Sequence, residues 1–225
     1  MNKKSRIFWF VYIFFILFFS FSVFKNVFFQ FSLTKQINSF LFISNLLQRL
    51  SGSVALFLLF VQIIFGAYRP KLSKLLGNWV MNFHIWQGRV IYVLVLIHTF
   101  SLLLFNFISK KGFDPFYVFV DFCVLCQTRK ELFYSFGRFG FWLLNLAILS
   151  ALVRKDNWWR QNWRYFHILN YFLFFLISLH AFFIGSDFSL RVGYLGKLNL
   201  FFSIFVISVI LVRFFNWFLK NFKLS

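Results

Sequence analysis

Long apolar runs, separated by short basic or polar segments, follow one another along the whole of this 225-residue chain. A helix that crosses a bilayer needs about 20 mainly apolar residues. The pattern predicts six such helices, at about residues 7–24, 52–68, 82–107, 137–153, 163–184 and 198–218. The expected fold class is therefore all-α, an integral membrane bundle of six helices.

The segments between the runs are expected to be loops. Residues 25–49 are a mixture of polar and apolar residues, which suggests a loop with an interfacial segment, and 108–136 predict a longer loop broken at Asp114-Pro115. The first run follows a basic start, as a signal peptide does. It is long for one and no small-residue cleavage site follows, so we expect an uncleaved first span. The expected division is 1–49, the first span and its connecting segment, and 50–225, the core.

Composition supports lipid as the solvent. The chain is 61% hydrophobic, with 42 Phe and a mean hydropathy of +0.78, whereas soluble domains are about half apolar. The net charge of +19 would suggest nucleic acid if it formed a patch on a polar surface. The basic residues lie mostly between apolar runs, where they set membrane topology. We expect a lipid bilayer as partner and no nucleic acid.

Charge also gives an orientation. If the N-terminus is inside, the inner segments carry slightly more Lys and Arg than the outer ones, and most acidic residues lie outside. This favours a multi-pass protein of a bacterial-type inner (cell) membrane with both termini cytoplasmic.

All four histidines lie in the third and fifth predicted spans. His84 and His98 are 14 residues apart, and His167 and His180 are 13 apart. At about 1.5 Å per residue these intervals are about 21 and 20 Å. One complete hairpin separates the two spans, so they run in the same direction. We therefore expect His84 to face His167 at one depth and His98 to face His180 at the other.

Two imidazoles that face each other at one depth are suited to the axial positions of a haem iron. Cofactor sites in helix bundles are built from such facing side chains. The pattern thus predicts two b haems between spans three and five, with the four histidines as iron ligands. Zinc fits less well, because the pairs are too far apart to share an ion and no carboxylate completes a site.

Other readings of the histidines remain open. Histidines inside a membrane also make simple hydrogen bonds between helices, and the chain would then be a non-haem transporter or assembly subunit. The 13-residue interval leaves His167 and His180 about 140° apart on an ideal helix. A kink, a π-bulge or helix tilt would have to bring them together. No Ser/His/Asp set, nucleotide loop or carboxylate pair is present, so we expect no catalytic residue for hydrolysis or phosphoryl transfer.

Several further residues are candidates near the haems. Arg89 and Arg164 could bind haem propionates, because a guanidinium suits a carboxylate, or they could anchor the helices at the interface. Gly88 could let a porphyrin approach the backbone, or simply allow close helix packing. Cys123 and Cys126 have the C-x-x-C spacing of redox dithiols. They would lie on the outer, oxidising side, as a redox dithiol, a plain disulfide or two unpaired thiols.

The chain resembles the ferric reductase-like transmembrane domain over about residues 50–218. The resemblance lies in Val61-Gln62, Gly66, Arg69-Pro70, His84-Ile-Trp-Gln-Gly88-Arg89, His98, Trp163-Arg164-Tyr-Phe-His167, Tyr171, His180 and Gly185-Ser186-Asp187. The domain occurs in ferric reductases, in NADPH oxidases and in the haem-binding membrane subunit of a periplasmic methionine sulfoxide reductase system. It implies that the four histidines ligate two b haems and that electrons pass from the cytoplasmic to the outer side.

The chain departs from the family in one respect. In ferric reductases and NADPH oxidases the sixth span leads into a flavin- and nicotinamide-binding domain, whereas this sequence ends at Ser225 and contains no G-x-G-x-x-G loop. We expect an oxidoreductase component whose donor is a cytoplasmic flavoprotein, which would supply FAD, or a membrane quinol; the outer acceptor is unknown. Sulfoxide reductase subunits often lack the first histidine of the third span. This chain keeps His84, so that assignment is the runner-up.

Overall fold

The computed structural model describes residues 2–34, 38–123, 125–188 and 193–221. The elements in chain order are α1 (Lys3–Thr34), α2 (Ser39–Ala67), α3 (Arg69–Leu76), α4 (Val80–Ile108), α5 (Pro115–Phe119), α6 (Arg129–Leu152), α7 (Asn157–Ile184) and α8 (Tyr194–Asn221). Among these described segments, six helices are long and apolar enough to cross a membrane, while α3 and α5 are short connectors. The expected all-α, six-helix membrane fold is confirmed.

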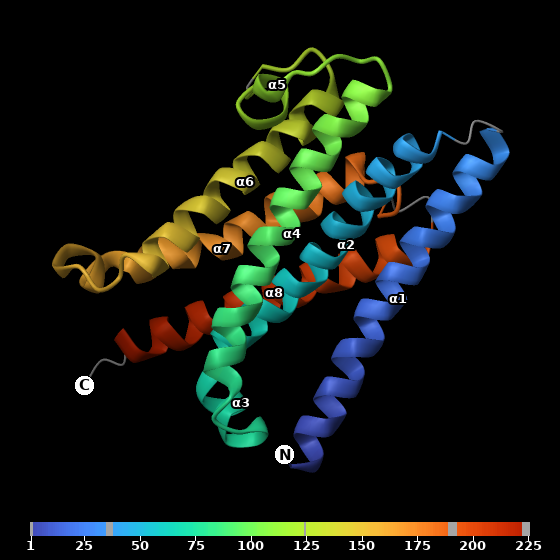
Figure 1. The fold of residues 1–225 in the computed structure, drawn as a ribbon. Coiled ribbons are helices and arrows are strands. Elements are labelled where there is room, and N and C mark those ends of the chain that lie inside the picture. The colour runs from blue at the N-terminus through green and yellow to red at the C-terminus, as the bar shows by residue number, and fades with distance from the viewer. Residues whose placement is uncertain (1, 35–37, 124, 189–192, 222–225) are drawn as a thin grey trace.

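Successive spans run in opposite directions, so the bundle has two ends with different contents (Figure 1). We call the end with α3 and the α6–α7 connection the proximal side; α1 begins there and α8 ends there. The distal side carries α5 and the α1–α2 and α7–α8 connections. His84 and His167 lie toward the proximal side, and His98 and His180 toward the distal side.

Helix α2 is the centre of the bundle, with α1, α4, α7 and α8 around it (Figure 1). Every side chain from Val54 to Val61 is buried. A helix that is apolar on all sides is stable only where it is surrounded, either by protein or by lipid. Here protein surrounds it, and the outer helices present their own apolar side chains, such as Phe10 and Phe107, outward.

Two antiparallel hairpins, α2 with α4 and α6 with α7, make the closest helix contacts of the fold. Small residues allow this approach: a Cβ at Gly140 would lie 2.6 Å from Cγ2 of Ile177. Between the hairpins contact is sparse, and α4 and α7 make almost no backbone contact with each other along their described lengths. One polar bridge joins the hairpins near mid-depth, where the Tyr92 hydroxyl donates to Oδ1 of Asn145 at 2.9 Å.

The prediction of a loop over residues 25–49 is wrong. Helix α1 continues to Thr34 and α2 begins at Ser39, so a short connection joins two long helices. Asn38 caps α2 by accepting hydrogen bonds from the backbone N–H groups of Phe40 and Leu41. The polar residues of this stretch suggest a loop, but several of them make hydrogen bonds within the bundle, mainly to Asp187.

The main such pairing is a buried cluster on the distal side. Arg49 donates from Nε and Nη2 to the two carboxylate oxygens of Asp187, at 2.7 and 2.6 Å. It also donates to Gln30 at 2.7 Å, and Asn26 donates to Asp187 at 2.9 Å. The Arg49 and Asp187 side chains are only 10% and 3% exposed. The cluster therefore ties α1 and α2 to the connection between α7 and α8.

Candidate functional site

The proximal pair brings the rings of His84 and His167 together across the two hairpins. Their centroids are 6.1 Å apart and their planes are inclined by 71°. Both side chains are half-buried. The expected facing of these two histidines is therefore present, although the helices that carry them hardly touch along their backbones.

Side-chain amides surround the proximal rings. The Gln62 amide donates to the backbone carbonyl of His84 at 2.9 Å, and its nitrogen lies 3.4 Å from His84 Nε2. Nδ1 of His84 is buried and has no hydrogen-bond partner. On the other helix, the Asn170 amide lies 3.4 Å from Nδ1 of His167. Burying an imidazole nitrogen without a hydrogen-bond partner costs folding free energy. Nδ1 of His84 is therefore available to bind a ligand.

The distal histidines are held in a different way, by backbone carbonyls. Nδ1 of His98 lies 2.7 Å from the carbonyl oxygen of Gln48, and Nδ1 of His180 lies 2.9 Å from that of Phe133. Because a carbonyl only accepts, Nδ1 carries the proton in both rings and Nε2 keeps its lone pair. A ligand histidine is usually oriented through its second nitrogen in this manner.

A glycine lies against each distal ring. A Cβ at Gly52 would be 2.6 Å from His98 Nδ1, and one at Gly137 would be 2.8 Å from His180 Nδ1. Each glycine follows its accepting carbonyl, on Gln48 or Phe133, by four residues, so carbonyl and glycine share one helix face. Only glycine leaves room for the ring to reach the carbonyl. Each hairpin thus holds its distal histidine with a backbone carbonyl and a glycine four residues later.

The 13-residue interval between His167 and His180 is accommodated within α7, which is continuous α-helix from Asn157 to Ile184 without a π-turn. Both rings meet α6, His167 at the backbone of Ala147 and His180 at that of Phe133. Ala147 and Phe133 are themselves 14 residues apart, so the contacts are set by the register of α6 against α7.

The other predicted site residues, Gly88, Arg89 and Arg164, make other contacts. Gly88 packs against α2, where a Cβ would be 3.1 Å from Nε2 of Gln62. Arg89 and Arg164 are exposed, and the Arg164 guanidinium lies over the ring of Trp163 at 5.8 Å. The Trp163 ring in turn lies 5.6 Å from His167.

Cys123 and Cys126 form a disulfide in the distal loop between α5 and α6. The Cys123 N–H donates to the hydroxyl of Ser135 at 2.9 Å, and Ser135 lies on α6 between Phe133 and Gly137. The loop is therefore attached to the turn of α6 that holds His180.

A buried arginine organises the same loop. Arg138 donates to the backbone carbonyls of Tyr117 and Asp121 at 2.7 and 2.5 Å. The Tyr117 hydroxyl donates to Glu131 at 3.1 Å. Burial, and then the nearby Glu131 carboxylate, raise the pKa of Tyr117 to about 12. The phenol therefore stays protonated at neutral pH and keeps this hydrogen bond.

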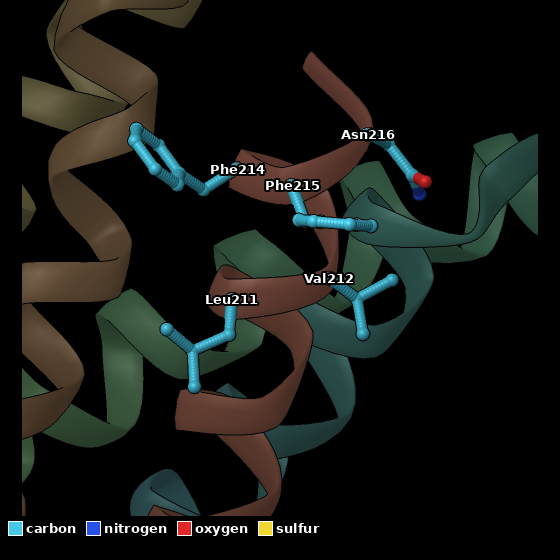
Figure 2. Close-up of a pocket in the computed structure, with 5 residues that line it drawn as sticks. All are labelled: Leu211, Val212, Phe214, Phe215 and Asn216. Carbon is cyan, nitrogen blue, oxygen red and sulfur yellow. The ribbon is translucent and has the colours of Figure 1, made fainter. Parts of the chain in front are cut away.

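An apolar hollow of about 400 Å³ lies apart from the histidines, on the proximal half of α8 (Figure 2). It is lined by Leu211, Val212, Phe214, Phe215 and Asn216, all exposed side chains of one helix. Such a surface suits lipid chains. Across the described residues, His, Cys, Asp and Glu gather in no group of three or more that could hold a bare metal ion. Of the four histidines, His84 and His167 lie ring to ring, while His98 and His180 each lie at a backbone carbonyl.

The sequence did not identify Gly52, Gly137 or the two carbonyls as parts of the site. One signal was available: Gly52 and Gly66 are 14 residues apart, the same interval as His84 and His98. In an antiparallel hairpin this places a glycine opposite each histidine, and a Cβ at Gly66 would indeed lie 3.4 Å from His84 Cε1.

In the described part of the chain, six helices long and apolar enough to span a membrane, two of which carry all four histidines, define a multi-pass membrane protein. The family is given by comparison with known proteins: residues 51–178 match the family model described as "Ferric reductase like transmembrane component". The match covers more than half of the chain, which therefore belongs to this family. It includes three of the four histidines and ends two residues before His180. No curated protein and no solved structure matches the chain significantly. Membership supports a role in electron transfer across a membrane.

Proposed function

We propose that this protein binds two b haems, one between His84 and His167 and one between His98 and His180, and conducts electrons from the proximal to the distal side. The observation that carries the proposal is the facing of His84 and His167 from two hairpins that otherwise scarcely touch. When bound, haem iron supplies one-electron chemistry, with its potential set by axial ligation and burial.

The residues fit that group. His84 and His167, whose ring centroids are 6.1 Å apart, would hold the proximal haem between them. At the distal pair, Nδ1 of each ring is engaged by a carbonyl, which leaves Nε2 available. At the proximal pair, His84 offers a buried nitrogen without a partner.

The protein orients the histidine rings and surrounds them with apolar helices. Gln48 and Phe133 fix the rotation of the distal rings through their carbonyls, while Gly52 and Gly137 give those rings the space to lie there. The apolar helices that carry the histidines lie in the bilayer, which shields the rings from water. Tyr92 and Asn145 hold the hairpins in register at mid-depth.

The orientation follows from charge and redox chemistry. Arg69, Lys71, Arg154 and Lys155 lie at the proximal end, which carries slightly more Lys and Arg than the distal end, as the positive-inside rule expects of a cytoplasmic side. A disulfide on the distal side suits an oxidising compartment. We infer that a cytoplasmic flavoprotein or a membrane quinol reduces the proximal site, and that an acceptor outside the cell membrane takes electrons from the distal site.

The test is a reduced-minus-oxidised absorption spectrum of the purified full-length protein, with haem quantified as the pyridine haemochrome. The proposal predicts a b-type spectrum and two haems per chain. A protein that is colourless as isolated, and stays so after incubation with haem, would leave the histidines as packing residues and contradict the proposal.

A further inference from the structure

The distal loop contains a reactive group for which the proposed electron path has no need. The Cys123–Cys126 disulfide joins residues only three positions apart. Both cysteines are half-buried, and Leu125 between them is 96% exposed. An apolar side chain presented to this extent next to a disulfide is a contact that a second protein can use.

The loop does not depend on the disulfide for its position. Arg138, itself only 5% exposed, holds the backbone of Tyr117 and Asp121, and Ser135 holds the N–H of Cys123. The disulfide adds no link between separate helices. Because it closes so short a loop, it removes little entropy from the unfolded chain, which is the main way in which disulfides stabilise proteins.

Cys126, whose sulfur lies 3.1 Å from the backbone oxygen of Cys123, is close in the sequence to groups that favour a thiolate. Cys126 lies two residues before Thr128, the N-cap of α6, and the first residues of that helix, Arg129 and Lys130, are exposed. A helix N-terminus and neighbouring cations both stabilise a thiolate and increase its reactivity. The one carboxylate of this turn, Glu131, accepts a hydrogen bond from Tyr117 and lies 4.0 Å from Arg138, so its negative charge is partly balanced.

We propose that Cys123–Cys126 is a thiol–disulfide exchange site for a dithiol protein on the distal side. A thiolate of the partner attacks one sulfur, the Cys123–Cys126 bond breaks, and a mixed disulfide forms while the other cysteine leaves as a thiolate. The second thiol of the partner, after losing its proton, attacks the mixed disulfide. The partner ends as a disulfide. Cys123 and Cys126 end as two thiols, because the two protons lost by the partner's thiols pass through the solvent to the two leaving thiolates.

The reverse exchange restores the disulfide, so the couple passes two electrons at a time in either direction. The site lies on the same turn of α6 as the groups that hold His180. A partner that engages Cys123 and Cys126 is thereby bound beside the distal histidine pair. The exchange reaction itself needs no haem, so it goes beyond the proposed electron path and can fail or succeed independently of it.

The experiment uses the full-length protein in detergent, incubated with a glutathione buffer or with reduced thioredoxin as the probe, and then labelled with a thiol-reactive maleimide that shifts the mass. We expect two labelled thiols per chain after incubation under native conditions, and re-formation of the disulfide with oxidised thioredoxin. Structural disulfides resist the glutathione pool. A disulfide that opens only after denaturation would overturn the proposal.

Two sets of variants make the result specific. Replacing Arg129 and Lys130 together by Gln removes the cations that follow Cys126 in the chain and should slow exchange several-fold. Lys110→Gln, in the connection between α4 and α5, should not. The double variant Cys123→Ser, Cys126→Ser should keep the melting temperature of the parent protein. A fall of many degrees in that variant would show a structural disulfide and contradict the proposal.

Discussion

The distal and proximal histidine pairs are built from the same two hairpins, yet they are held by different groups. At the distal pair, backbone carbonyls lie 2.7 and 2.9 Å from Nδ1, and glycines lie against both rings. At the proximal pair, the amides of Gln62 and Asn170 approach ring nitrogens at 3.4 Å, and the two rings lie against each other.

The two sites differ in how far the histidine rings are already oriented before a ligand binds. A backbone carbonyl on a packed helix has a fixed place, so the distal rings are oriented in advance, as precise binding sites require. Side-chain amides rotate, and the unpartnered Nδ1 of His84 shows that the proximal ring is not yet fully engaged. We expect the distal site to be rigid and intolerant of substitution, and the proximal site to be more adaptable.

The largest expected effect comes from filling the space behind a distal ring. In Gly137→Ala the new Cβ would lie 2.8 Å from His180 Nδ1, so the ring must leave the Phe133 carbonyl. Loss of such an orienting partner typically costs about 10–100-fold in metal affinity. We expect about one of two haems to be lost, as measured by pyridine haemochrome.

The matched control on the proximal side is Gly66→Ala, where the new Cβ would lie 3.4 Å from His84 Cε1. This distance borders on ordinary contact, so both haems should remain. Equal haem loss in the two variants would remove the contrast between a rigid and an adaptable site.

The next largest effect is expected from the buried Arg49–Asp187 ion pair, which lies next to Gln48 in the distal site. Arg49→Met leaves the Asp187 carboxylate buried without its cation, which costs about 3–5 kcal/mol. Because Arg49 adjoins Gln48, the distal haem should also be released at lower temperature than the proximal one. Thermal melting followed by haem absorbance measures both. Adding Asp187→Asn should recover much of the stability, and a double variant as unstable as Arg49→Met would argue against the buried ion pair.

A smaller effect is expected from Gln62→Leu on the proximal side. The change removes the hydrogen bond to the His84 carbonyl and the amide beside its ring, at a cost of about 1 kcal/mol. In a redox titration, one of two midpoint potentials should shift while the other stays in place. A shift of both potentials would mean that Gln62 acts on the whole bundle.

The smallest effect is expected at mid-depth. Tyr92→Phe removes one hydrogen bond between the hairpins, worth about 1 kcal/mol or less. Both haems should be retained and the melting temperature should fall by a few degrees at most. Loss of either haem in this variant would mean that one hydrogen bond, rather than the hairpins, sets the distance between the histidines.

The sequence predicted the spans and the facing of His84 and His167. Both follow from the length and spacing of the apolar runs and from the direction in which each helix crosses the membrane. Apolar runs predict the helices, and two histidines on parallel helices must lie at matching depths. It failed at residues 25–49 because Arg49 is buried by a partner, Asp187, that lies 138 residues away. Nothing local distinguishes such an arginine from a loop residue.

The supports of the distal rings could not be predicted either, for a different reason. The accepting groups are main-chain carbonyls, which every residue has, and Gly52 and Gly137 are ordinary helix residues until the ring against them is known. The register between facing helices decides which carbonyl and which glycine a histidine meets. That register is set by packing across the hairpins.

The central claim is that each haem is shared between the hairpins, His84 with His167 and His98 with His180. Haem counts on paired histidine variants test it most directly. The distal double variant, His98→Ala with His180→Ala, should retain one haem per chain, and a cross variant, His84→Ala with His180→Ala, should retain none. A distal double variant without haem, or a cross variant that keeps a full haem, would contradict the pairing on which the account rests.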